Sequence, residues 1–175
     1  MKNTIFSFML SASFLLGCLE EEILYIDKSC DMDEIQAIFR AVDKINGVLG
    51  YEEVAVVGSK NVDYVKEANE TNGVSMFMCI SDSEAGAQFP NFDISVGRNW
   101  RDDIYVRSDL TTYGDYGIRG FEYVAMHELM HFIGVGGDEH TDNPDDVISK
   151  YFEPTTMPIE YSDIDKELIK KYSRR

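Results

Sequence analysis

One pentapeptide, His127-Glu128-Leu129-Met130-His131, restricts what this chain can fold into more than any other feature. Two side chains four positions apart project from the same face of an α-helix, so both imidazoles can reach one metal ion. Imidazole nitrogen is a common zinc ligand, and a glutamate beside the first ligand can take a proton from a metal-activated water. The pentapeptide therefore predicts a helix that carries a zinc site. The alternative is a chance match, a helix with two surface histidines and a glutamate.

The third histidine of the chain favours a metal site over a chance match. The sequence contains three histidines, and His140 follows soon after the first two. Gly134, Gly136 and Gly137 lie between them, and glycine accepts the left-handed conformation that ends a helix and turns the chain sharply. Because a catalytic zinc ion usually has three protein ligands, we expect this turn to bring a third ligand back to the metal.

The helix and the turn resemble those of a known family. Residues 124–134, Val-Ala-Met-His-Glu-Leu-Met-His-Phe-Ile-Gly, are similar to the active-site helix of the metzincin zinc peptidases, whose pattern is H-E-x-x-H-x-x-G-x-x-H or D. Gly134 matches the glycine of this pattern. The pentapeptide is similar to that of astacins, whereas residues 134–138, 143–147 and 161–165 are closer to bacterial matrixin-like proteins.

The chain departs from the family pattern at one position that matters for the chemistry. The third ligand of the pattern falls on Gly137, which has no side chain. Two substitutes stay open, Asp138 after a shift of one residue or His140 after a longer loop. Imidazole is the commoner zinc ligand, so we favour His140. With neither in reach, the site would have two protein ligands and bind metal poorly, as in a degenerate relative.

The resemblance implies a zinc-dependent endopeptidase. In this interpretation His127, His131 and His140 bind Zn²⁺, and Glu128 is the general base for a zinc-activated water that hydrolyses a peptide bond. The partner is a peptide or protein substrate, which would lie extended along a sheet edge. The alternative is a catalytically degenerate metzincin-fold lipoprotein that acts as a surface binding module. Calcium, which matrixin relatives hold, has no Asp-x-Asp-x-Asp-Gly loop here to support it.

Metzincins also place a methionine in a tight turn beneath the zinc. Met157 lies between Pro154 and Pro158, which favour a fixed turn, whereas the matrixin register puts Ile148 at that position. Both assignments stay open. A tyrosine after the turn can present its hydroxyl to the metal side, and Tyr161 is the candidate, although its spacing from Met157 differs from that of astacin-like enzymes.

The N-terminus resembles a bacterial lipoprotein signal. Residues 1–17 have a positive head and a mostly apolar run, and Leu15-Leu16-Gly17-Cys18 resembles the lipobox, whose cysteine is acylated. We therefore expect a signal peptide at 1–17, an acidic tether at 18–22 and one metzincin-like catalytic domain at 23–175. The protein would be anchored to a membrane through lipid on Cys18, in the bacterial cell envelope. An ordinary signal peptide or a buried N-terminal helix is the alternative.

Hydrophobic spacing predicts the fold class. Apolar residues three and four positions apart over Met32–Leu49 predict a long helix, with Asp31 as N-cap and Gly50 as C-cap. Further helices are expected at 121–133 and 162–172. Short β-branched or aromatic runs predict strands at 23–26, 54–57, 74–80, 92–96 and 103–106. The expected fold is α+β and metzincin-like, with a mixed twisted sheet of about five strands, a long packing helix, an active-site helix and a C-terminal helix.

Charge and cysteines limit the possible partners. The 32 acidic and 16 basic residues give a formal charge of −16, which repels phosphate backbones and argues against a nucleic-acid partner. We expect the acidic runs at 20–22 and 142–146 to be solvated. Cys30 and Cys79 form either one disulfide or two buried thiols. Nothing in the sequence indicates the oligomeric state.

Overall fold

The computed structural model describes residues 22–58, 75–81, 83–84, 97–100, 103–111, 117–151 and 158–173. Its helices and strands follow in the order β1 (Glu22–Ile26), α1 (Met32–Leu49), β2 (Val54–Gly58), β3 (Ser75–Ile80), β4 (Gly97–Trp100), β5 (Asp103–Arg107), α4 (Gly117–Phe132) and α5 (Asp163–Tyr172). Single 3-10 turns form η1 (Ser108–Thr111) and η2 (Gly137–Glu139). The expected signal peptide, Cys18, the strand at 92–96 and Met157 lie outside the described residues.

The described strands form one mixed sheet in the order β2-β1-β3-β5-β4. β1 pairs in parallel with β2 and β3, and β3 pairs in parallel with β5. β4 runs antiparallel to β5 and ends the sheet on one side. The prediction of a mixed sheet of about five strands is confirmed, but β4 was not predicted. Its sequence, Gly-Arg-Asn-Trp, has little strand propensity, so pairing with β5 rather than local preference makes it a strand.

The bounds of α1 match the prediction because local signals set both ends. The Asp31 side chain accepts hydrogen bonds from the N–H groups of Asp33 and Glu34, and the Glu34 carboxylate accepts one from the Asp31 N–H at 2.8 Å. This reciprocal cap satisfies donors that the first turn leaves open. Gly50 ends the helix with φ 77°. The buried stripe of the helix includes Ala37, Ile38, Ala41, Val42 and Ile45.

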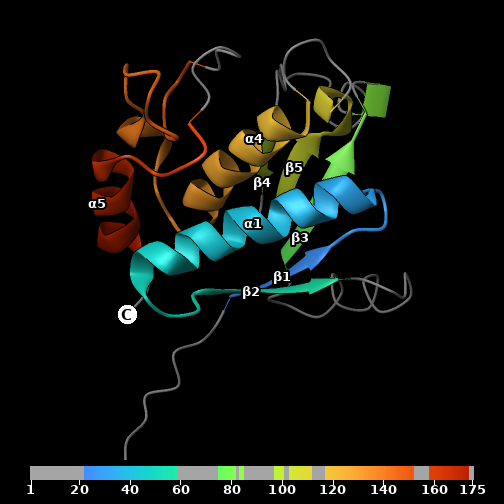
Figure 1. Cartoon of the computed structure of the whole chain (residues 1–175), viewed down its shortest axis with the longest axis horizontal. Coiled ribbons are helices and arrows are strands. Elements are labelled where there is room, and N and C mark those ends of the chain that lie inside the picture. The colour runs from blue at the N-terminus through green and yellow to red at the C-terminus, as the bar shows by residue number, and fades with distance from the viewer. Residues whose placement is uncertain are drawn as a thin grey trace, which may run out of the picture.

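Two helices pack on the sheet and enclose the core. In Figure 1, α1 and α4 cross in front of the strands, and α5 lies to their left. One cluster of buried side chains joins these layers, including Phe77 of β3, Ile104 of β5 and Phe121 of α4. The rings of Phe77 and Phe121 have centroids 6.2 Å apart. α4 therefore packs over β5 and β4, and Phe121 extends this packing to β3.

A carboxylate between the two helices adds a polar link. Glu122 of α4 accepts a hydrogen bond from Lys44 at 2.5 Å and another from Arg40 at 2.7 Å, both on α1. Burial acts to raise the pKa of Glu122, but the hydrogen bonds and charges of the two cations outweigh burial and lower it. Glu122 therefore stays ionised at neutral pH, as a buried charge does when it is paired.

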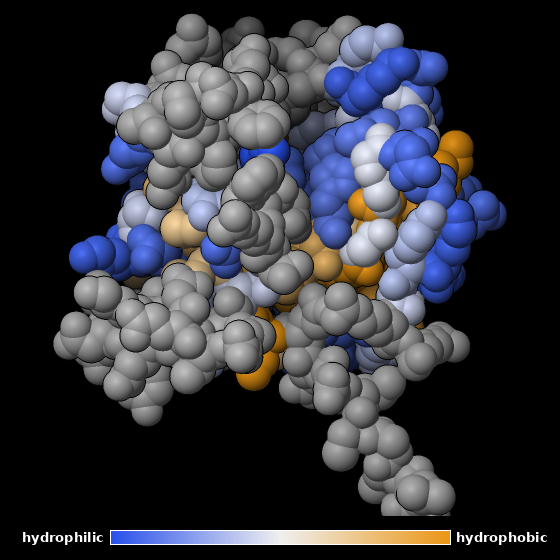
Figure 2. Space-filling view, turned by 180° about the vertical axis from the view of Figure 1, so that it is seen from behind, coloured by the Kyte–Doolittle hydropathy of each residue, from blue (hydrophilic) through white to orange (hydrophobic). Residues whose placement is uncertain are grey.

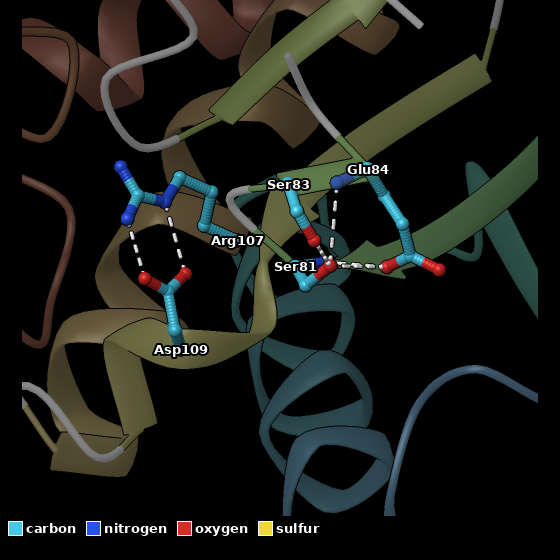
Figure 3. Close-up of polar contacts among 5 residues, drawn as sticks. All are labelled: Ser81, Ser83, Glu84, Arg107 and Asp109. Carbon is cyan, nitrogen blue, oxygen red and sulfur yellow. Dashed lines mark hydrogen bonds and ion pairs between the residues drawn. The ribbon is translucent and has the colours of Figure 1, made fainter. Parts of the chain in front are cut away.

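Polar side chains form hydrogen bonds and an ion pair at the carboxyl ends of β3 and β5, as Figure 3 shows. Arg107 ends β5 and forms an ion pair with Asp109 in η1, and hydrogen bonds from this guanidinium lower the pKa of Asp109. Beyond β3, the Glu84 carboxylate accepts hydrogen bonds from the N–H and the hydroxyl of Ser81, at 2.8 and 2.7 Å. Both sets of contacts provide hydrogen-bond partners for polar groups where a strand ends, so we interpret them as structural.

Cys30 and Cys79 form a disulfide. It joins the segment before α1 to β3 across a sequence separation of 49 residues, and both cysteines are buried. Of the two arrangements that the sequence left open, the structure therefore has the disulfide. A bridge over a segment of this length restricts the unfolded chain strongly.

The surface has both hydrophilic and hydrophobic parts. Seen from behind in Figure 2, hydrophilic residues cover much of the upper described surface, and hydrophobic residues are visible in its middle. Among the large apolar side chains that the structure describes, Met32 of α1 is the most exposed, at 67%. Among the described helices, none has both the length and the apolar character that a bilayer span requires.

Candidate metal centre

α4 carries the pentapeptide into the core. The helix begins at Gly117, earlier than the predicted Phe121, and ends at Phe132. Most of its residues from Gly120 onward are buried, which is typical of a helix enclosed by the fold rather than lying on its surface. Gly134 has φ 106°, and its N–H donates to the His131 carbonyl oxygen at 3.0 Å. The predicted glycine turn after the helix is confirmed.

The three histidines converge on one point. The Nε2 atoms of His127 and His131 are 3.1 Å apart, and the Nε2 atom of His140 lies 3.1 Å from the former and 3.2 Å from the latter. His127 and His131 stand one turn apart on α4, whereas His140 directly follows η2. The Asp138 carboxylate instead lies over Gly136. Of the two candidates for a third ligand, the structure brings His140 to the pair and keeps Asp138 out of this cluster.

Each imidazole is oriented by a main-chain carbonyl oxygen that binds its Nδ1 atom. The acceptors are Val147 for His127 at 2.8 Å, Val135 for His131 at 2.8 Å, and Gly137 for His140 at 2.7 Å. A carbonyl oxygen only accepts, so each Nδ1 carries the proton, and the Nε2 of a neutral ring has a bare lone pair. Three lone pairs therefore face one another with no proton between them. Such an arrangement can accept a metal cation at its centre.

The pKa shifts keep two of these rings neutral. Burial, together with the neighbouring His131, lowers the pKa of His127 to about 3. Burial also lowers the pKa of His131. Both rings are therefore neutral at pH 7, which is the form that binds a metal ion.

The spacing of the three donors fits zinc. Tetrahedral zinc with Zn–N bonds of roughly 2.0–2.1 Å requires nitrogen donors roughly 3.3–3.4 Å apart. The observed separations of 3.1 and 3.2 Å are close to that requirement. Three neutral imidazoles also form a known ligand set for catalytic zinc, with the fourth position left to water or substrate. This His triad can therefore hold a zinc ion.

A buried carboxylate on α5 supports the turn beneath His127. Asp165 accepts hydrogen bonds from the N–H groups of Val147 at 2.9 Å and Ile148 at 3.1 Å. It also caps α5 by accepting the N–H of Ser162 at 2.8 Å. Because the Val147 carbonyl orients His127, Asp165 fixes this imidazole through one intervening peptide unit. The spacing of Ser162 and Asp165 is typical of a capping box, but nothing in the sequence links Asp165 to the metal centre.

The turn that contains Val147 corrects the prediction for the acidic run 142–146, and it also contains Ile148, one of the two candidates for the methionine-turn position. Asp146 is 1% exposed and accepts a hydrogen bond from Asn143, so the expectation that the whole acidic run 142–146 is solvated is wrong. Ile148 is fully buried in this turn next to Val147, which contacts His127. The turn beneath the histidines thus contains Ile148, while Met157 lies outside the described residues.

Tyr161 is a core residue. It is 3% exposed, and its hydroxyl donates to the Met126 carbonyl oxygen at 3.3 Å. Burial raises its pKa well above the ordinary value. Because the hydroxyl already donates to a carbonyl oxygen of α4, we assign Tyr161 to core packing rather than to a role at the metal ion.

The side chain of Glu128, on α4, lies against β4 at the edge of the described sheet. It is 5% exposed, and its Oε1 atom would be only 3.0 Å from a Cβ atom built on Gly97. The same Cβ would lie 2.5 Å from Val124 Cγ1. Only glycine lets β4 approach α4 this closely. Gly97 therefore leaves the space that Glu128, the predicted general base, occupies, and no motif in the sequence indicated this role.

Comparisons with known proteins bear on the fold of the chain. No protein-family model and no curated protein matches the chain. Among solved structures, it is similar to the crystal structure of archaemetzincin from Methanopyrus kandleri, with a TM-score of 0.59 over 90% of this chain and 98% of that one. The chain has a zincin-like fold. The identity is 14%, so the likeness is one of fold and does not transfer residue roles.

Proposed function

We propose that this protein is a zinc-dependent endopeptidase. The observation that carries the proposal is the convergence of three Nε2 lone pairs, 3.1 to 3.2 Å apart, with every Nδ1 proton bound elsewhere. His127, His131 and His140 would hold the zinc ion. The fold shared with archaemetzincin supports the same conclusion at a coarser level.

The chemistry follows from the residues around this centre. Zinc bound there would supply a Lewis acid that makes water more acidic and polarises a peptide carbonyl. Glu128, adjacent to His127 on α4, would accept a proton from the attacking water and donate it to the leaving amine. Burial of Glu128 excludes bulk water, which strengthens its electrostatic effect on the reacting groups.

The sheet edge supplies a binding mode for the substrate. β4 ends the described sheet, and its Gly97 lies against Glu128. An extended peptide that pairs with β4 would therefore pass beside the general base. Main-chain pairing demands no particular side-chain sequence, so we expect broad tolerance toward unfolded protein segments.

Zinc content and hydrolysis of an unfolded protein test the proposal together. We expect one zinc ion per chain, and we expect Glu128→Gln to retain zinc while losing hydrolysis. Wild-type protein without zinc would refute the metal site. Wild-type protein with zinc but no hydrolysis of any unfolded substrate would refute the peptidase and support the surface binding module.

We also propose that the chain is a lipid-anchored protein of the cell envelope. The lipobox-like Leu15-Leu16-Gly17-Cys18 supports this, and so does the disulfide, because structural disulfides persist mainly outside the cytosol. Metabolic labelling with a radioactive fatty acid tests it. Label should appear in wild type and disappear in Cys18→Ser, and an unlabelled wild type would exclude the anchor.

A further inference from the structure

We infer that the last turn of α5 positions His140 for metal binding by holding Glu139. The inference rests on the metal site proposed above, and it concerns the third ligand, because this chain has Gly137 where the family pattern has a histidine or an aspartate. Glu139 directly precedes His140, and two side chains of α5 bind its carboxylate. Glu139 is thus a positioning residue that acts through His140.

The three ligands differ in how firmly the chain holds them. His127 and His131 stand on α4, a buried helix, whereas His140 follows a loop that contains Gly134, Gly136 and Gly137. Glycine loses more backbone freedom on ordering than any other residue. If this loop became ordered only on metal binding, the entropy cost would weaken the affinity. A contact from outside the loop would order part of it before the metal binds and so reduce this entropy cost.

The end of α5 provides such a contact. Glu139 Oε1 accepts hydrogen bonds from Lys171 Nζ at 2.7 Å and from the Tyr172 hydroxyl. Lys171 Nζ also lies 4.6 Å from the centroid of the Tyr172 ring, so the two donors are arranged together. The Tyr172 carbonyl oxygen would be 4.0 Å from a Cβ atom on Gly134, at the start of the same loop. The last turn of α5 therefore binds the end of the loop at Glu139 and lies close to its start at Gly134.

The two donors contribute differently. The Lys171 side chain is 57% exposed, so its ion pair with Glu139 stabilises the loop only weakly. Tyr172 is partly buried and packs against the hydrophobic core, which fixes its ring before any metal binds. We therefore assign most of the positioning to the hydroxyl of Tyr172. A glutamine at position 139 keeps an acceptor oxygen for this hydroxyl, although it loses the charge that pairs with Lys171.

Zinc affinity of the full chain, measured by competition with a chelator, tests the inference. We expect Glu139→Ala to weaken affinity about tenfold, the lower end for partners that orient metal ligands. Tyr172→Phe should cause a smaller loss, and Glu139→Gln should restore most of the affinity. Glu167→Ala and Lys170→Met alter exposed residues on the same helix and serve as matched controls that should bind zinc like wild type.

A double-mutant cycle separates positioning from a general loss of stability. In a His140→Ala background, Glu139→Ala should have no further effect on zinc affinity, because the ligand through which it acts is gone. The absorption spectrum of bound Co²⁺ should change in Glu139→Ala and return toward wild type in Glu139→Gln. Metal-free melting temperatures should stay close to that of wild type, since the ion pair is exposed.

The outcomes distinguish this inference from the proposed function. Wild-type zinc affinity in Glu139→Ala, or an equal loss in the His140→Ala background, would overturn the inference and leave the metal site intact. A wild-type chain that binds no zinc, or one whose affinity His140→Ala does not change, would overturn the site and the inference together.

Discussion

Substitution of Gly97 by alanine tests the proposed placement of the general base. β4 approaches α4 so closely that a Cβ atom at position 97 would lie 2.5 Å from Val124 Cγ1 and 3.0 Å from Glu128 Oε1. Gly97 has no positive φ, so the backbone itself tolerates alanine. The predicted effect is therefore a collision of side chains, and Glu128, the proposed general base, is one of the two residues that the new methyl group would meet.

The size of the effect follows from these distances. Carbon atoms in contact lie about 3.5–4.0 Å apart, so the new methyl group must displace its neighbours by about 1 Å. Overpacking of this kind costs about 1–3 kcal/mol of folding free energy. Misplacement of a catalytic group by about 1 Å costs about 100-fold in rate. We expect Gly97→Ala to fold, to retain zinc and to lose about 100-fold in kcat/KM.

The assay compares Gly97→Ala with a second glycine-to-alanine variant. Gly47 is exposed on α1 and a Cβ atom there meets nothing within 4 Å, so Gly47→Ala should keep full activity. It should also gain about 0.5–1 kcal/mol in unfolding free energy, because alanine favours a helix. Zinc content, kcat/KM on an unfolded protein and denaturant midpoints are measured for both. Unchanged kcat/KM in Gly97→Ala would refute the argument that β4 sets the position of Glu128.

Three further predictions concern the ligands, acid stability and the disulfide. His140→Ala should bind zinc measurably but much more weakly than wild type in competition with a chelator, and Asp138→Ala should bind it like wild type; the reverse result would transfer the third ligand to Asp138. The pKa of His127 is about 3 in the folded chain and 6.5 ordinarily, so the unfolded chain binds more protons between these values. The unfolding free energy of the metal-free protein should therefore fall as the pH falls from 6.5 toward 3. In His127→Gln, denaturation curves should give an unfolding free energy that depends less steeply on pH. The same steepness in this variant and in wild type would contradict the prediction. Cys30→Ala/Cys79→Ala should lower the unfolding free energy by about 4 kcal/mol in urea, as a bridge over a separation of 49 residues predicts, and an unchanged midpoint would argue against the bridge.

The parts of the fold that were predictable from sequence depend on local signals. α1 matches its prediction from Met32 to Leu49 because a capping residue, an apolar stripe and a terminal glycine all act within a few residues. The joint placement of His127 and His131 follows from helix geometry alone. β4 has no comparable signal, since its hydrogen bonds come from β5 and its own residues do not favour a strand.

The parts of the site that were not predictable depend on the main chain and on distant contacts. The atoms that orient the imidazoles are carbonyl oxygens, and every residue has one, so no residue type marks their positions. The choice between His140 and Asp138 depends on the path of a glycine-rich loop, which sequence spacing does not determine. Asp165 reaches Val147 only because α5 folds back against the turn.

The short length of β4 has a consequence for the chain as a whole. A strand at the margin of a sheet presents unpaired amide groups, and such margins can recruit identical molecules into aggregates. β4 has four residues, among them a glycine and an arginine, and both its brevity and its charge discourage stacking of one copy on another. In the described sheet, such a margin would suit the transient pairing that we propose for an extended substrate, and it offers neighbouring copies few groups with which to pair.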